Sequence, residues 1–110
     1  MVQYQPHLDR VFHALSDSTR RDILARLDHE NLGVNALCGD YNMSLPAVAK
    51  HVKVLEEAGL VKTTKQGRVR TVMARPENLK IAADWVAHYE RYWDDALARF
   101  AAYVEGEEMQ

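Results

Sequence analysis

The sequence predicts a mainly α-helical protein that carries one small β-hairpin. Apolar residues recur with a helical period over most of the chain. The pattern becomes extended and rich in Val and Thr only between Leu60 and Ala74. A chain of 110 residues has room for one hydrophobic core, so we expect a single domain over residues 1–110.

Two helices are expected in the N-terminal part, residues 5–30. The first runs from Pro6 to Leu15 and should bury one apolar face: Leu8, Val11, Phe12 and Leu15. Asp17 is a suitable N-cap for a second helix, from Ser18 to about His29. This helix would turn three side chains inward: Ile23, Leu24 and Leu27. It would leave three arginines available to solvent or phosphate: Arg20, Arg21 and Arg26.

A short helix followed by a tight turn is expected next. Residues 31–33 read as a connection, and Asn35 can cap a third helix from Ala36 to Tyr41 that buries Leu37. Asn42 tolerates the left-handed conformation that often ends a helix. Together with the longer helix that follows, these residues predict a helix-turn-helix over residues 35–59.

The longer helix is expected to have two unlike faces. Ser44 can cap its start, Pro46 fits its first turn, and Gly59 supplies a stop. The inner face consists of Val48, Val52 and Leu55, with Leu45 and His51 at its margins. The outer face has small side chains at the start of the helix and lysines further along. This pattern suits the major groove of DNA. We therefore expect DNA contacts from Ser44, Leu45, Pro46, Ala47, Ala49 and Lys50, with Lys53 on phosphate, whereas His51 is expected to be structural.

A basic β-hairpin, residues 60–75, follows directly. Its strands are expected over Leu60–Lys65 and Val69–Ala74, with the turn at Gln66-Gly67-Arg68. Lys65, Arg68 and Arg70 lie at its tip and flanks and are expected to contact DNA. A basic hairpin after such a helix predicts the wing of a winged helix-turn-helix. The alternative is a solvated hairpin with ordinary surface lysines and arginines.

A last helix is expected from Glu77 to Val104, that is, over residues 77–104, followed by a frayed acidic tail from Gly106 to Gln110. Its apolar face is unusually rich in aromatic residues. We expect the excess to form a dimer interface, since exposed aromatic stripes mark partner sites. The interface would consist of Trp85, Tyr89, Trp93 and Phe100, packed against their mates or the partner's first helix around Phe12. The alternative is that the whole face packs against the first helix of the same chain.

Positive charge is concentrated in the middle third of the chain. Residues 1–43 carry four cations against six carboxylates, residues 44–75 carry seven against two, and residues 76–110 carry three against eight. The net charges of these segments are therefore −2, +5 and −5, and the whole chain carries −2. A local excess of this kind is expected of a small nucleic-acid binder whose remaining surface repels the duplex.

Composition excludes several other classes of protein. No apolar run approaches the roughly 20 residues of a membrane span, and the first residues lack the pattern of a signal peptide. We therefore expect a cytoplasmic protein with no membrane partner. Cys38 is the only cysteine, which excludes an internal disulfide and a thiolate zinc site. We expect it to be a small buried side chain, not a redox sensor.

Three segments resemble the ArsR family of bacterial winged-helix repressors: residues 14–24 (ALSDSTRRDIL), 44–55 (SLPAVAKHVKVL) and 58–61 (AGLV). The likeness extends from about Leu8 to Leu97. The resemblance implies a homodimer that binds a double-stranded DNA operator and represses transcription until an effector changes its affinity. The sequence does not identify the operator or the effector.

The sequence departs from the family at the positions that sense metals. The cysteine pair of many members would fall at Gly33 and Asn35, and Val86 stands where a histidine is needed two residues after Asp84. Asp84 and His88 share one helix face, but such a pair is more often an ion pair than a metal site. We therefore expect no metal site and no cofactor.

The leading hypothesis is a dimeric DNA-binding repressor that does not respond to metals through the usual motifs. The alternative is a winged-helix module that binds protein and has no salt-dependent affinity for DNA. An enzyme is not expected, because the sequence contains no nucleophile elbow, no phosphate-cradling glycine loop and no histidine and carboxylate set that would share a pocket.

Overall fold

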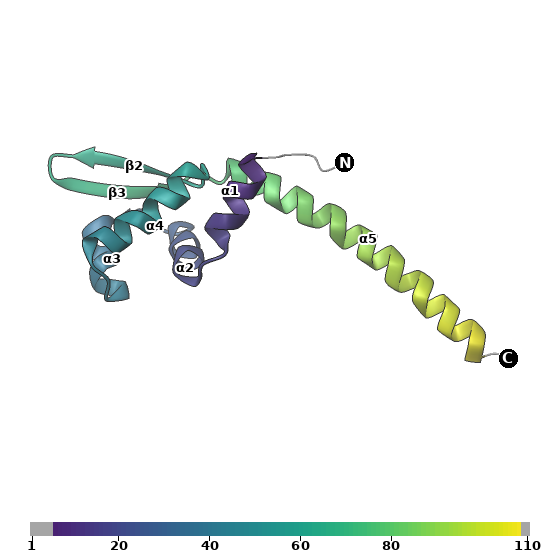
Figure 1. Ribbon diagram of the computed structural model, residues 1–110. Coiled ribbons are helices and arrows are strands. Elements are labelled where there is room, and N and C mark those ends of the chain that lie inside the picture. Colours follow the sequence, from purple (N-terminus) through teal and green to yellow (C-terminus); the bar gives the residue numbers. More distant parts are fainter. Residues whose placement is uncertain (1–5, 109–110) are drawn as a thin grey trace.

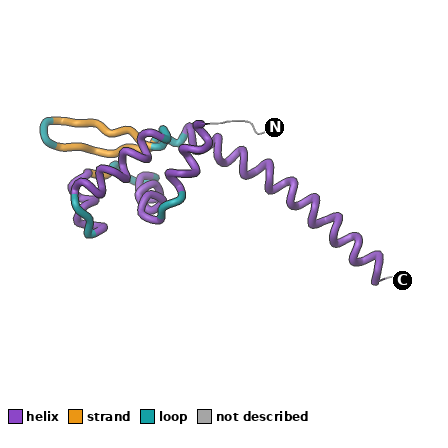
Figure 2. Tube along the Cα trace, viewed as in Figure 1, coloured by secondary structure: helices purple, strands orange, loops and turns teal. Residues whose placement is uncertain are grey.

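The computed structural model describes residues 6–108 and has the predicted fold class, a winged helix-turn-helix (Figure 1). Its elements follow in this order: α1 (Pro6–Leu15), α2 (Ser18–Leu27), β1 (Leu32–Gly33), α3 (Val34–Tyr41), α4 (Leu45–Glu57), β2 (Val61–Gln66), β3 (Val69–Ala74) and α5 (Glu77–Glu108). The long β2–β3 hairpin and the far end of α5 extend in opposite directions from the helices between them (Figures 1 and 2).

The residues predicted to cap α2 and α4 and to end α3 and α4 lie at those helix ends. The Asp17 side chain accepts a hydrogen bond from the backbone N–H of Arg20, and Ser44 Oγ accepts one from the N–H of Ala47. Asn42 adopts the left-handed conformation with φ 54°, and Gly59 has φ 72°. Because these signals are local in sequence, they set the turn between α3 and α4 and the end of α4 as expected.

One hydrophobic core joins the elements, and each described helix and strand contributes to it. Its buried side chains are Leu8, Val11, Ala14, Ile23, Leu27, Leu32, Val34, Leu37, Val48, Val52, Leu55, Ala58, Leu60, Val61, Val72 and Ala82. The three predicted inner residues of α4 are all among them, which fixes the rotation of this helix and turns its opposite side outward.

The connection between α2 and α3 differs from the prediction. Residues Leu32 and Gly33 form strand β1, which pairs with Val72 and Thr71 to give a three-stranded antiparallel sheet in the order β1-β3-β2. Because this pairing holds the chain extended as far as Gly33, α3 starts at once with the buried Val34. Gly33 is the N-cap, so the prediction that Asn35 caps α3 is wrong.

Two predicted helix ends were also wrong. Helix α2 ends at Leu27, before the expected His29, and the N–H of His29 donates to the carbonyl of Arg26 at 3.2 Å, a bond that tightens the last turn. Helix α5 continues through Gly106 to Glu108, so the expected frayed tail is helical that far. Residues 109–110 of that tail lie outside the described part of the chain.

Helix α5 leaves the rest of the molecule after its first turns. Its 32 residues correspond to about 48 Å at 1.5 Å per residue. The molecule measures 74 × 31 × 22 Å and has a radius of gyration of 19.9 Å, whereas a compact domain of this length has about 13 Å. The difference arises from the part of α5 that projects away from α1 (Figure 1).

Candidate nucleic-acid interface

The outer face of α4 carries most of the predicted DNA-contacting residues on the surface. Five of these residues are exposed: Ser44, Leu45, Pro46, Lys50 and Lys53. Ala47 and Ala49 are half-buried and bring the backbone of α4 close to the surface. The burial of one face confirms the predicted division of this helix, and contact with DNA stays a prediction.

The hairpin forms a wing on which the three cations predicted to contact DNA are exposed: Lys65, Arg68 and Arg70. Gln66 pairs with Val69, so the loop has only two residues, and Gly67 supplies a φ of 62° at the first of them, as a two-residue hairpin turn requires. Lys65 lies directly opposite Arg70 across the two strands. Like charges opposite one another destabilise an isolated hairpin, and an anionic partner would relieve their repulsion.

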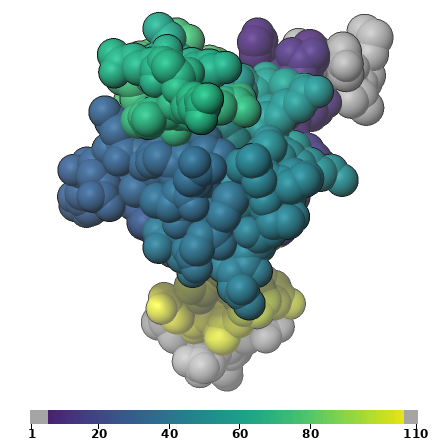
Figure 3. Space-filling model, turned by 90° about the vertical axis from the view of Figure 1, so that its left-hand side faces the viewer, coloured from purple at the N-terminus to yellow at the C-terminus, as the bar shows by residue number. Residues whose placement is uncertain are grey.

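Two adjoining hollows bring the wing and the start of α4 together. A hollow of about 310 Å³ is lined by Val34, Ala49, Val52, Lys53, Glu56 and Arg70. A second, of about 210 Å³, is lined by Val34, Asn35, Leu45, Arg68 and Arg70. Because Arg70 borders both, the wing cations and the outer face of α4 form one surface. Figure 3 shows this end of the molecule, with the hairpin (green) above α3 and α4 (blue and teal).

Two residues of this surface were missed by the sequence analysis. Asn35 lies beside Leu45 and Arg68 instead of capping α3, and nothing in the local sequence indicates that position. The carboxylate of Glu56 accepts a hydrogen bond from the hydroxyl of Thr63, which ties α4 to β2. Its position three residues after Lys53 places it on the same helix face, a signal that could have found it.

The three arginines of α2 were predicted to be available to solvent or phosphate, but only Arg21 is exposed, and all three make contacts within the chain. Arg21 donates to the carbonyl of Leu15 at 2.8 Å. Arg26 forms an ion pair with Asp40 at 2.7 Å and lies 5.6 Å from the centre of the Tyr41 ring. A hydrogen bond to Tyr41 and, second, the contact with Asp40 raise the pKa of Arg26. These contacts join α2 to α3.

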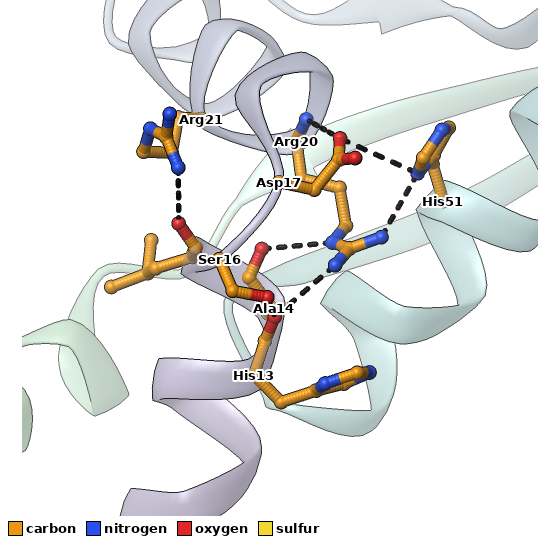
Figure 4. Close-up of polar contacts among 8 residues, drawn as sticks. His13, Ala14, Ser16, Asp17, Arg20, Arg21 and His51 are labelled. Atoms are coloured by element: carbon orange, nitrogen blue, oxygen red, sulfur yellow. Dashed lines mark hydrogen bonds and ion pairs between the residues drawn. The ribbon is translucent and has the colours of Figure 1, made fainter.

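Arg20 is the clearest of these corrections, because its exposed fraction is only 9%. Its Nε donates to the carbonyl of Ala14 at 2.8 Å, and Nη2 donates to the carbonyl of His13 at 3.1 Å (Figure 4). Its position three residues before Ile23 and seven before Leu27 places it on the buried face, which the sequence could have indicated.

His51, which was predicted to be structural, contacts side chains of α2 and of the residue that precedes α2. The Nη1 of Arg20 lies 3.1 Å from Nδ1 of His51, and an Asp17 carboxylate oxygen lies 3.8 Å from the same nitrogen. The pKa of Asp17 is lowered, chiefly because its carboxylate accepts the backbone N–H of Arg20, with a further contribution from the charge of Arg20.

The predicted dimer residues of α5 remain largely uncovered. Phe12 packs edge-to-face on Trp85, with ring centroids 5.4 Å apart. Beyond this contact, Tyr89 is 44%, Trp93 59% and Phe100 65% exposed. Of the described side chains after Ala82, none is buried, so the alternative that the whole face packs within the chain is wrong.

The described residues were also compared with the requirements of a metal site, a reactive cysteine and a membrane span. Among residues 6–106, whose side chains the structure describes, no three His, Cys, Asp or Glu side chains lie close enough together to hold a metal ion. Cys38 is half-buried, and its thiol donates to the carbonyl of Val34 at 3.5 Å. No helix in the described part of the chain has the length and apolar character to cross a membrane.

Comparison with known proteins agrees with this geometry. A family model described as a helix-turn-helix domain matches residues 15–64, from the last residue of α1 into β2. The HTH-type transcriptional regulator Rv2034 of Mycobacterium tuberculosis (strain ATCC 25618 / H37Rv) is 38% identical over 99 residues, which cover 90% of each chain.

Solved structures share the fold. The ArsR family transcriptional regulator RHA00566 is 38% identical, with a TM-score of 0.77, over 86% of this chain and 97% of the other. A fragment of Mb0332 from Mycobacterium bovis, described as a homodimeric winged helix-turn-helix DNA-binding domain, is 19% identical, with a TM-score of 0.61, over 82% and 91% of the two chains. From the helix-turn-helix, the wing and the relatives at 38% identity, we conclude that this chain belongs to the ArsR family of winged helix-turn-helix transcriptional regulators.

Proposed function

We propose that this chain is a homodimeric repressor that binds a palindromic DNA operator through α4 and the β2–β3 wing. The observation that carries the proposal is the single surface on which the exposed outer face of α4 meets Arg68 and Arg70 of the wing. A helix with a small, exposed N-terminal half can enter the major groove, and flanking cations bind phosphates.

The proposed contacts divide by chemistry. Leu45 and Ala47 reach thymine methyl groups, and Lys50 donates to guanine N7 or O6. Ser44, Pro46 and Ala49 allow the helix to approach closely. Lys53, Lys65, Arg68 and Arg70 neutralise phosphates. Lys50→Ala should lose about 1–3 kcal/mol on the preferred operator and less on random duplex. Equal losses on both would make Lys50 a phosphate contact only.

Dimer formation is proposed through the uncovered aromatic face of α5. Trp93 and Phe100 are more than half exposed on a helix that projects from the domain. A patch of this kind is typical of a partner site. A second copy is the occupant we propose, because an operator of two half-sites about 34 Å apart needs two recognition helices. Mb0332, which has the same fold, is described as homodimeric.

We also propose that the regulating signal is not a metal bound at the family's usual positions. Gly33 and Asn35 stand at the positions of the cysteine pair and Val86 at that of the histidine. None of these side chains is a ligand for zinc or a comparable ion. Added zinc at micromolar concentration should therefore leave operator affinity unchanged, and a marked loss of affinity would contradict this part of the proposal.

One experiment tests the function directly. The purified protein should select a palindromic sequence from a pool of random duplexes, and its affinity for that sequence should fall steeply with salt. The logarithm of affinity should decline with a slope of about −0.9 for each phosphate contact. If no sequence is enriched and no salt-dependent binding is found, the DNA-binding function is wrong, and a module that binds protein would replace it.

A further inference from the structure

Arg20 connects three helices at one point. The residue lies in the first turn of α2, and its side chain reaches the last residues of α1 and the middle of α4 (Figure 4). The guanidinium donates to the carbonyls of His13 and Ala14 and contacts Nδ1 of His51. Every one of these distances is between 2.8 and 3.1 Å, within the range of good hydrogen bonds.

The chemistry of arginine fixes the state of the histidine. A guanidinium has only N–H donors and stays protonated in proteins, so His51 Nδ1 must accept and carry no proton. The ring proton is then on Nε2. The Asp17 carboxylate, 3.8 Å from Nδ1, adds negative charge beside the buried Arg20 cation. A buried charge is retained only when its donors are satisfied, and this cluster supplies three acceptors.

The same end of α1 also contacts α5. Phe12 directly precedes the carbonyls that accept from Arg20, and its ring packs on Trp85 with centroids 5.4 Å apart. A chain of direct contacts therefore runs from α5 through α1 and Arg20 to His51 on α4. Since α4 is the proposed recognition helix and α5 the proposed dimer helix, the Arg20–His51 bond lies between the two.

We propose that Arg20 and His51 are positioning residues that set the separation of the two recognition helices in the dimer. The proposal rests on the dimeric DNA-binding function proposed above. Arg20 holds α4 against the end of α1, so α4 cannot shift along α1 without breaking a charge-assisted bond. In each chain, the recognition helix α4 is then held at a fixed position relative to the dimer helix α5. The two half-sites of the operator must therefore lie at one fixed spacing.

His51 can be changed without removing the core of α4. Its side chain is 19% exposed, whereas Val48, Val52 and Leu55, which form the buried face of α4, are at most 3% exposed. His51→Asn keeps an acceptor near the position of Nδ1, and His51→Leu has a similar size and no acceptor. The two variants form a matched pair that separates the hydrogen bond from packing. Thermal unfolding of each variant shows whether the domain is folded.

The test compares two duplexes: the operator selected by the wild-type protein and the same operator with one base pair inserted between its half-sites. The wild-type protein and His51→Asn should bind the lengthened operator at least about tenfold more weakly, because one half-site is displaced. His51→Leu should bind the selected operator about tenfold more weakly, the value of one bond to a charged group. It should also discriminate less than about threefold between the two duplexes.

Each outcome of this test has a distinct meaning. Failure of the wild-type protein to bind any duplex contradicts the proposed function. If the wild-type protein binds and His51→Leu discriminates as strongly as His51→Asn, the positioning role is wrong. Nitrogen NMR of His51 gives a check without DNA: Nδ1 should be unprotonated and Nε2 protonated at neutral pH, and the reverse would overturn the proposed bond.

Discussion

Replacing Trp93 by alanine should separate the two chains of the proposed dimer and leave the winged part of the protein folded. In a single chain, 59% of Trp93 is exposed. A tryptophan side chain presents roughly 250 Å², so roughly 150 Å² is open to a partner. At about 25 cal/mol per Å², covering this area stabilises the dimer by about 4 kcal/mol for each chain.

Alanine would retain a small part of this area, so the expected loss is about 3 kcal/mol for each chain and about 6 kcal/mol for the dimer. A loss of this size raises the dissociation constant by about four orders of magnitude, since each 1.4 kcal/mol is about tenfold. The value is an upper bound, because it assumes that the partner covers the whole exposed side chain. No core contact is lost in the single chain.

Sedimentation at micromolar concentration measures the effect. The wild-type protein should sediment as a dimer and Trp93→Ala as a monomer with weakened operator binding. Val69→Ala is the matched control, because Val69 is 61% exposed but lies on the wing. A Trp93 variant that stays dimeric with full affinity, or a wild-type protein that is already monomeric, would refute the location of the interface.

Three further predictions follow from the wing, a helix cap and a turn. Replacing Arg68 and Arg70 together by alanine should make the slope of log affinity against log salt shallower by about 0.9 for each lost phosphate contact, and an unchanged slope would remove the wing from the interface. The pKa of Asp17 lies below its ordinary value of 3.8, so its carboxylate stabilises the fold above about pH 4 and this contribution is lost as the pH falls further. The wild-type protein should therefore lose more free energy of unfolding between about pH 5 and about pH 3 than Asp17→Asn, which keeps the cap and does not titrate, and equal losses would contradict the assignment. Gly59→Ala should cost at least about 1 kcal/mol in chemical denaturation, because φ is 72° and the new Cβ would lie 2.0 Å from a side chain of α5, whereas Gly39→Ala, with nothing within 4 Å, should not destabilise.

The features predicted correctly from the sequence were those that residues close together in the chain determine. The ends of α4 followed from Ser44 and Gly59, and its buried face followed from the helical period. Strand β1 could not be predicted in this way. Leu32 and Gly33 are too few to show a period, and they are a strand only because Val72 and Thr71, some 40 residues later, pair with them.

The candidate site likewise has features that the local sequence predicts and features that depend on the tertiary fold. The exposure of Lys50 follows from helix geometry alone, whereas the meeting of Leu45 with Arg68 around one hollow depends on how the hairpin folds back. Arg20 was misplaced because a cation is usually exposed. Its burial depends on the carbonyls of His13 and Ala14 at the end of α1 and on a histidine 31 residues later, which the local pattern does not contain.

The base of the wing has a consequence for how the protein could be altered. The N–H of Arg75 donates to the carbonyl of Leu60 at 2.8 Å, and Asn78 Nδ2 donates to that of Gly59 at 3.2 Å. The end of α4 and the start of α5 are therefore held close together, and this does not depend on the length of the hairpin between them. Pairs of residues could be added or removed near Gly67 without moving either helix. The length of the hairpin can therefore be changed by engineering independently of the helices.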